Sequence, residues 1–136
     1  MDRILDMARS GPVYLRQPDI ASLVVAALQH GDCQLGRYQL HSFVVMPNHV
    51  HLLVTPQVAA SLLLGPLKGF TAHEANGIPG LRGRPFWQDE SYDHLIRSKA
   101  EFERVRAYIE NNPVKAGLVT TPEEFRWSSA SVNKAA

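Results

Sequence analysis

The stretch HSFVVMPNHVHLLVTP, residues 41–56, joins two apolar runs through a break at Pro47-Asn48. The first run alternates and is rich in β-branched residues, which is typical of a strand. The second has the same character, and two such runs separated by a short break predict an antiparallel hairpin. It also carries His49 and His51 among aliphatic residues. The stretch therefore predicts a sheet in which polar groups interrupt an apolar strand.

The two histidines lie one residue apart on the second strand. Because side chains alternate along a strand, His49 and His51 point to one face while Val50 points to the other. Two imidazoles on one face can share a metal ion, with the histidines facing outward and the apolar side covered by a helix. The alternative is that one histidine packs and the other is solvated. Both interpretations stay open on these residues alone.

The rest of the chain alternates between helical and extended patterns. Gly31 is expected to end the first helix, Gly65-Pro66 to kink or delay the second, and Asn112-Pro113 to end the third. The second helix is expected to present an apolar face of Leu62, Leu63, Leu67 and Phe70. The spacings predict helices over 19–29, 58–76 and 99–111, strands over 37–46 and 86–97, a loop over 76–85, and a short strand around Val13 to Leu15.

This order of elements indicates one α+β domain, residues 1–136, with helices over one antiparallel sheet. The 45% hydrophobic and 20% charged content is that of an ordinary globular protein. No apolar run approaches the roughly 20 residues that span a bilayer. A lone cysteine, Cys33, excludes an internal disulfide and fits a reducing cytoplasm. The net charge of +1 argues neither for nor against nucleic acid.

Tyr108 and Asn112 are four residues apart, so they share one face of the last predicted helix. A tyrosine hydroxyl is a weak nucleophile near neutral pH, because its pKa is about 10. It needs a reactive electrophile, such as a phosphodiester bound to a divalent cation. Together with His49 and His51, Asn112 would form an N and O ligand set suited to Mg²⁺ or Mn²⁺.

Three motifs in this order resemble the single-tyrosine HUH transposases, and most closely the REP-associated tyrosine transposases of the IS200-like group. They are MPNHVHLLV at 46–54, FWQDESYDHLIR at 86–97 and YIENNPVKAGLV at 108–119. The resemblance implies a ferredoxin-like fold that binds single-stranded or hairpin DNA. It also implies cleavage through a 5′-phosphotyrosine intermediate and a free 3′-hydroxyl.

Position by position, the resemblance assigns His49 and His51 as metal ligands, Tyr108 as the nucleophile and Asn112 as a third polar ligand. Tyr92 is a rival nucleophile, and its neighbour His94 resembles a base. However, Tyr92 has no partner at helical spacing and matches a non-catalytic family position. Positive residues are frequent from Lys68 to Arg106, and the expected contacts to the DNA backbone come from four of them: Lys68, Arg84, Arg97 and Arg104.

Phe86 and Trp87 could stack on unpaired bases or pack into the core. The resemblance departs at the N-terminus, where ILDMARSGPVYL is a poor match to the family's central first strand. The first strand is therefore expected to be short or missing. Residues 12–16 could replace it, a second chain could donate the pairing in a homodimer, or the true start could lie upstream.

Three functions remain open. The first is a metal-dependent transposase acting through Tyr108, in the cytoplasm and at the nucleoid when bound to DNA. The second is a DNA-binding protein that has lost cleavage, which the weak N-terminus suggests. The third is a metallonuclease that uses water and forms no covalent adduct.

Overall fold

A four-stranded antiparallel sheet forms the centre of the computed structural model, in the order β2-β3-β1-β4. The structure describes residues 2–9, 15, 18–59, 62–75, 77 and 87–131. The predicted α+β fold and the hairpin of β2 and β3 are confirmed. The elements are β1 (Arg3–Arg9), α1 (Pro18–Cys33), β2 (Tyr38–Met46), β3 (His49–Pro56), α2 (Leu64–Ala75), β4 (Trp87–Leu95), α3 (Lys99–Lys115) and a 3₁₀ turn, η3 (Pro122–Glu124).

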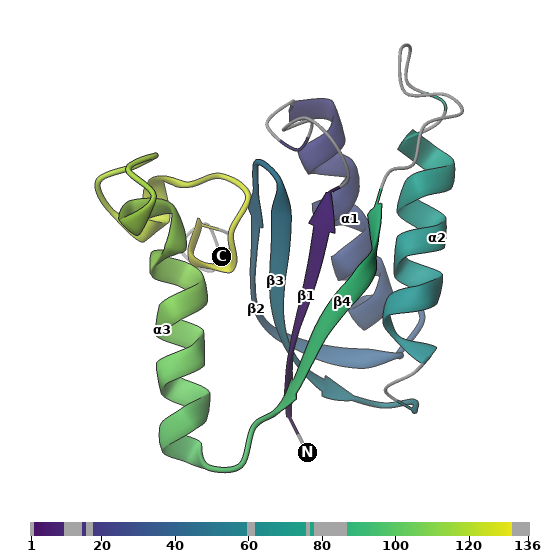
Figure 1. Cartoon of the computed structure of the whole chain (residues 1–136), viewed down its shortest axis with the longest axis horizontal. Helices are drawn as coiled ribbons and strands as arrows, with labels where there is room; N and C mark the ends of the chain where they lie inside the picture. Colours follow the sequence, from purple (N-terminus) through teal and green to yellow (C-terminus); the bar gives the residue numbers. More distant parts are fainter. Residues whose placement is uncertain are drawn as a thin grey trace.

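The sheet is covered on both faces, as Figure 1 shows, with α1 and α2 on one side and α3 on the other. On the first side, Leu5, Val50 and Leu52 belong to a buried cluster that α1 and α2 complete. On the second, Ile4 and Leu53 pack with Ile109 of α3. Successive residues of β1 and β3 thus enter different apolar clusters, as the two-residue period of a strand requires.

The expectation of a short or missing first strand is wrong. β1 pairs with β3 on one side and with β4 on the other, so it holds the central position that the family resemblance implies. This strand is hard to recognise from the sequence because both of its faces are covered. It therefore lacks the alternation of polar and apolar residues that marks a half-exposed strand. Of residues 12–16, the described Leu15 lies in a helical turn, and the rest fall outside the described residues.

Two predicted helix ends are also wrong. Gly31 lies inside α1, which ends at Cys33. α3 passes through Pro113 and ends at Lys115, before Gly117 with φ +78°. A proline costs the helix one hydrogen bond, but its fixed φ is itself helical. The predicted late start of the second helix is confirmed, since α2 begins at Leu64.

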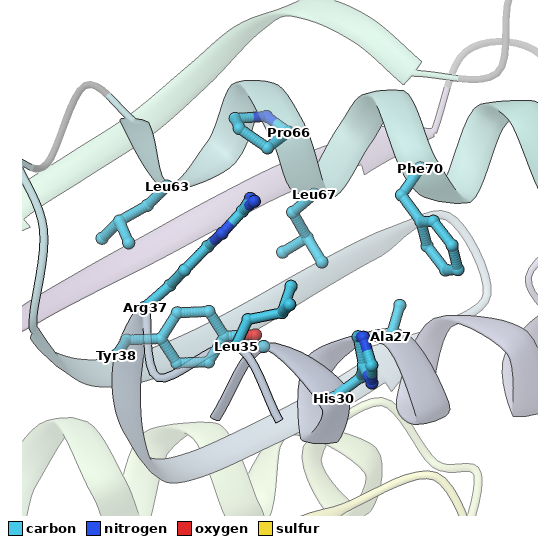
Figure 2. Close-up of a pocket in the computed structure, with 10 residues that line it drawn as sticks. Ala27, His30, Leu35, Arg37, Tyr38, Leu63, Pro66, Leu67 and Phe70 are labelled. Carbon is cyan, nitrogen blue, oxygen red and sulfur yellow. The ribbon is translucent and has the colours of Figure 1, made fainter. Parts of the chain in front are cut away.

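The predicted apolar face of α2 is half right, because Leu63 and Leu67 are buried whereas Leu62 and Phe70 are exposed. Phe70 borders a hollow of about 190 Å³ between α1 and α2. Figure 2 shows Leu67 and Phe70 of α2 facing His30 and Ala27 of α1 across it. Most of the predicted loop at 76–85 lies outside the described residues.

Gly31 matters because Tyr38 packs directly against it. The Tyr38 hydroxyl donates to the Leu28 carbonyl oxygen over 2.6 Å, and burial raises the pKa of Tyr38 well above its usual value. A Cβ on Gly31 would collide with the hydroxyl and ring of Tyr38, whereas a Cβ on Gly69 of α2 would meet nothing. Gly69 therefore has room for a larger side chain, whereas Gly31 has none.

We predict opposite effects for the same substitution at these glycines. Gly31→Ala should lower the free energy of unfolding by about 1–3 kcal/mol through overpacking. Gly69→Ala should raise it by about 0.5–1 kcal/mol, because alanine costs less backbone entropy in a helix. Urea denaturation followed by circular dichroism measures both. Stabilisation by Gly31→Ala would contradict the packing of Tyr38.

Candidate active site

His49 and His51 lie on the face of β3 that α3 covers. Val50, between them, is fully buried on the opposite face, under α1 and α2. The histidines therefore share a face as predicted, but that face is not open. His51 is only 7% exposed, and His49 is partly buried. The expectation that the pair faces outward is wrong, because the last helix occupies this side of the sheet.

The two imidazoles lie against each other, and each uses its Nδ1 atom. Their ring centroids are 4.6 Å apart. His49 Nδ1 lies 2.6 Å from Oδ1 of Asn48, and His51 Nδ1 lies 2.5 Å from Oδ1 of Asp6. His51 Nε2 is buried and has no hydrogen-bond partner among the described residues. A buried polar atom without a partner is costly, so this nitrogen marks a place that suits a ligand.

The environment of His49 favours its neutral form. Burial, and then the nearby charge of His51, lowers the pKa of His49 below the usual histidine value, although Asp6 opposes the shift. A neutral imidazole is the form that binds a metal ion. The lowered pKa of His49 and the partial or full burial of the two rings are therefore both compatible with a bound metal ion.

α3 brings Tyr108 to the same place. The helix begins after Ser98, whose side chain accepts a hydrogen bond from the Glu101 N–H as an N-cap. Ile109 is fully buried against the sheet, which turns the adjacent Tyr108 toward the rim. The Tyr108 ring centroid is 5.7 Å from that of His51, and the residue is 49% exposed. Tyr108 thus lies between the buried His51 and the solvent.

Asn112 is half-buried and lies one turn after Tyr108. Because α3 continues past Pro113, the shared helical face expected for Tyr108 and Asn112 exists. His, Cys, Asp and Glu in the described part of the chain form no group of three that could hold a metal ion. The predicted set of His49, His51 and Asn112 contains only two residues of these types, so its third ligand would be the Asn112 amide.

Comparison with known proteins identifies the family of this chain. The family model described as "Transposase IS200 like" matches residues 20–112, more than half of the chain. The chain belongs to this transposase family. Its fold is similar to that of a REP-associated tyrosine transposase bound to a REP hairpin (TM-score 0.74, 18% identity, covering 98% of this chain and 79% of that one).

A second similar structure is that of a candidate transposase from Deinococcus radiodurans R1. It gives a TM-score of 0.60 at 26% identity and covers 82% of this chain and 89% of that one. No functionally curated protein matches the sequence.

A buried polar network ties the α3 helix of this transposase to its sheet. Ser129 donates to Glu110 Oε2 over 2.8 Å and accepts from the Phe43 N–H over 3.0 Å. Ser42 also reaches Glu110 Oε2, at 3.2 Å. In addition, the Val45 N–H donates to the Trp127 carbonyl oxygen, so the C-terminal segment lies along β2. This segment, which carries no motif, fixes the helix that presents Tyr108.

The predicted DNA-binding residues do not form one group. Arg104 lines a surface hollow of about 690 Å³ together with Tyr108 and Lys115. Arg97 is exposed between β4 and α3, at the opposite end of that helix from Lys115. Lys68 lies on α2, across the sheet from the histidines, and Arg84 lies outside the described residues. Lys115, which lines the same hollow as Arg104, was not among the predicted contacts.

The remaining predicted residues are Phe86, Trp87, Tyr92 and His94, of which the structure describes only a part. Trp87 is 8% exposed and donates its indole N–H to Thr71 Oγ1 over 2.7 Å, so it packs in the core. Phe86 lies outside the described residues. The backbone of Tyr92 pairs with Asp6, and its side chain also falls outside them. His94 Nε2 lies 3.6 Å from Glu101 Oε2 at the start of α3.

Two further observations concern the rest of the transposase. Cys33 is exposed at the end of α1, remote in sequence from the site. No helix in the described ranges combines the length and apolarity that crossing a bilayer requires.

We predict that Ser129→Ala loosens α3. The substitution removes the hydrogen bonds to Glu110 and Phe43 and leaves the buried Phe43 N–H without its Ser129 partner, which should cost about 1–3 kcal/mol. Ser22→Ala, at an exposed position of α1, is the control and should change stability by less than about 0.5 kcal/mol. Denaturation of the two variants in urea compares them. Equal stabilities would show that the serine–carboxylate network does not hold the helix.

Proposed function

We propose that this transposase cleaves and rejoins single-stranded DNA beside a hairpin, with Tyr108 as nucleophile and a divalent metal at the histidine pair. The observation that carries the proposal is the position of Tyr108. Its ring lies 5.7 Å, centroid to centroid, from His51, whose buried Nε2 has no partner in the described part of the chain. A nucleophile beside a candidate metal ligand is the arrangement that cleavage of a phosphodiester needs.

The chemistry balances without a further reactant. The Tyr108 oxygen forms a bond to the scissile phosphorus while the bond from phosphorus to the 3′-oxygen breaks. The DNA 5′-phosphate is then joined to the tyrosine, and the 3′-oxygen takes up a proton equivalent to the one that the tyrosine loses. Because the new ester retains the energy of the old one, the 3′-hydroxyl of another strand can reverse the step and join the DNA.

His49, His51 and Asn112 are the residues that would hold Mg²⁺ or Mn²⁺. Both histidines use Nδ1 for contacts within the protein, which leaves Nε2 as the ligating atom. When bound, the metal supplies neutralisation of negative charge on the phosphate. The cover of α3 and the surrounding apolar side chains would limit water at this point.

The DNA would enter over the exposed side of α3. Arg104 and Lys115 flank Tyr108 in the surface hollow and suit contacts to phosphates, and Arg97 extends the positive charge toward the start of the helix. The hairpin substrate is proposed by analogy with the REP-associated transposase of similar fold, whose structure is bound to a REP hairpin.

One chain holds both Tyr108 and the histidine pair, so we propose that the site works within a single subunit. The sheet needs no strand from a partner, because β1 already fills the position between β3 and β4. This removes the reason for expecting a homodimer and also the reason for expecting a protein that has lost cleavage.

The test uses a hairpin-bearing single strand labelled on the 5′-phosphate side, with Mn²⁺. We expect a covalent protein–DNA adduct that resists denaturing electrophoresis. Tyr108→Phe should abolish it, because the variant keeps the ring but loses the attacking oxygen. Tyr92→Phe is the matched control and should form the adduct as the wild type does.

Other outcomes would point elsewhere. Binding without cleavage would identify a DNA-binding protein, and cleavage without adduct that is indifferent to Tyr108→Phe would identify a nuclease that uses water. An adduct that persists in Tyr108→Phe would refute the assignment of the nucleophile.

A further inference from the structure

Asp6 lies on β1 directly across from His51 in the β1–β3 register. Its Oδ1 atom is 2.5 Å from His51 Nδ1, and the two side chains are 29% and 9% exposed. The family match begins at residue 20, so Asp6 stands outside the matched region and outside all three motifs. Asp6 belongs to β1, the strand that was not predicted from the sequence.

A carboxylate accepts hydrogen bonds but does not donate them, so the nitrogen facing Asp6 must carry the hydrogen. The Nδ1–H form of the neutral ring leaves a lone pair on Nε2, the buried atom without a partner among the described residues. Histidines that bind metals usually donate their other N–H to such an oxygen, which fixes both tautomer and ring orientation. The contact therefore has the form of an outer support for a metal ligand.

We infer that Asp6 is a positioning residue, which holds the His51 ring so that its Nε2 lone pair faces the metal. The inference rests on the proposed function, because it requires a metal at the histidine pair. His49 has a weaker support, since its Nδ1 faces an amide oxygen of the exposed Asn48. An amide can present either oxygen or nitrogen, whereas the Asp6 carboxylate presents oxygen on both sides.

The chain contains a matched control on the same two segments. The Asp2 carboxylate accepts from the Thr55 hydroxyl over 2.5 Å, and its side chain is 31% exposed. Asp2 precedes Asp6 by four residues and Thr55 follows His51 by four, so both pairs occupy the same sheet face. The Asp2 pair thus reproduces the carboxylate exposure and the short hydrogen bond of the Asp6 pair, but its partner, Thr55, is less buried than His51 and is not a candidate metal ligand.

The experiment titrates Mn²⁺ into the full-length wild type, Asp6→Asn, Asp2→Asn and His51→Ala by isothermal calorimetry. Asp6→Asn should weaken binding by roughly 10–100-fold, the usual effect of losing such a support. Asp2→Asn should leave the affinity unchanged. Thermal unfolding of each variant separates a loss of fold from a loss of affinity.

A second measurement needs no variant. Long-range ¹⁵N–¹H correlation spectra of the metal-free wild type at neutral pH report which ring nitrogen carries the hydrogen. We expect the Nδ1–H tautomer for His51, and Asp6→Asn should shift it toward Nε2–H because the amide can donate to Nδ1.

The outcomes distinguish the role of Asp6 from the presence of the metal site. If His51→Ala loses Mn²⁺ binding while a folded Asp6→Asn binds as the wild type does, the role of Asp6 is wrong and the metal site stands. If the wild type does not bind Mn²⁺, both the metal site and the role of Asp6 fail. An Nε2–H tautomer for His51 in the wild type would overturn the role of Asp6 even if Asp6→Asn does not fold.

Discussion

β3 must present different side chains to its two faces, because helices cover both faces of the sheet. Val50 and Leu52 fill the core under α1 and α2, and His51 and Leu53 face α3. A shift of the pairing by one residue would exchange the two faces and bury the histidines in the wrong core. The register between β1 and β3 therefore decides both the packing of the molecule and the location of its site.

The site depends on this register and on a second constraint, which is the attachment of α3. Ile109 anchors the helix through apolar contact, and Glu110 anchors it through Ser42 and Ser129. Tyr108 precedes both anchors, so its ring is set beside His51 while half of the residue remains exposed. Groups separated by almost sixty residues meet because two independent contacts hold one helix against one strand.

The parts predicted correctly from the sequence are those with a local period. The hairpin followed from two alternating runs, and the shared face of His49 and His51 followed from the two-residue repeat of a strand. The proximity of Tyr108 to the histidines required the family resemblance, because no local pattern relates α3 to β3.

The parts that were missed depend on tertiary contacts. β1 has no visible alternation since Ile4 and Leu5 are both buried, and without β1 the partner of His51 could not be found. The role of Ser129 depends on a segment folding back along β2, which leaves no motif in the sequence. The end of α3 was also predicted wrongly, because Pro113, a residue type that usually ends a helix, lies within α3.

The most direct test of Tyr108 as the nucleophile is mass spectrometry of the protein after reaction with DNA. Nuclease and trypsin treatment would leave a nucleotide on one peptide. We expect the modified peptide AYIENNPVK, residues 107–115, with fragment ions that place the phosphate on Tyr108. A nucleotide on the peptide that contains Tyr92, residues 83–97, would contradict it.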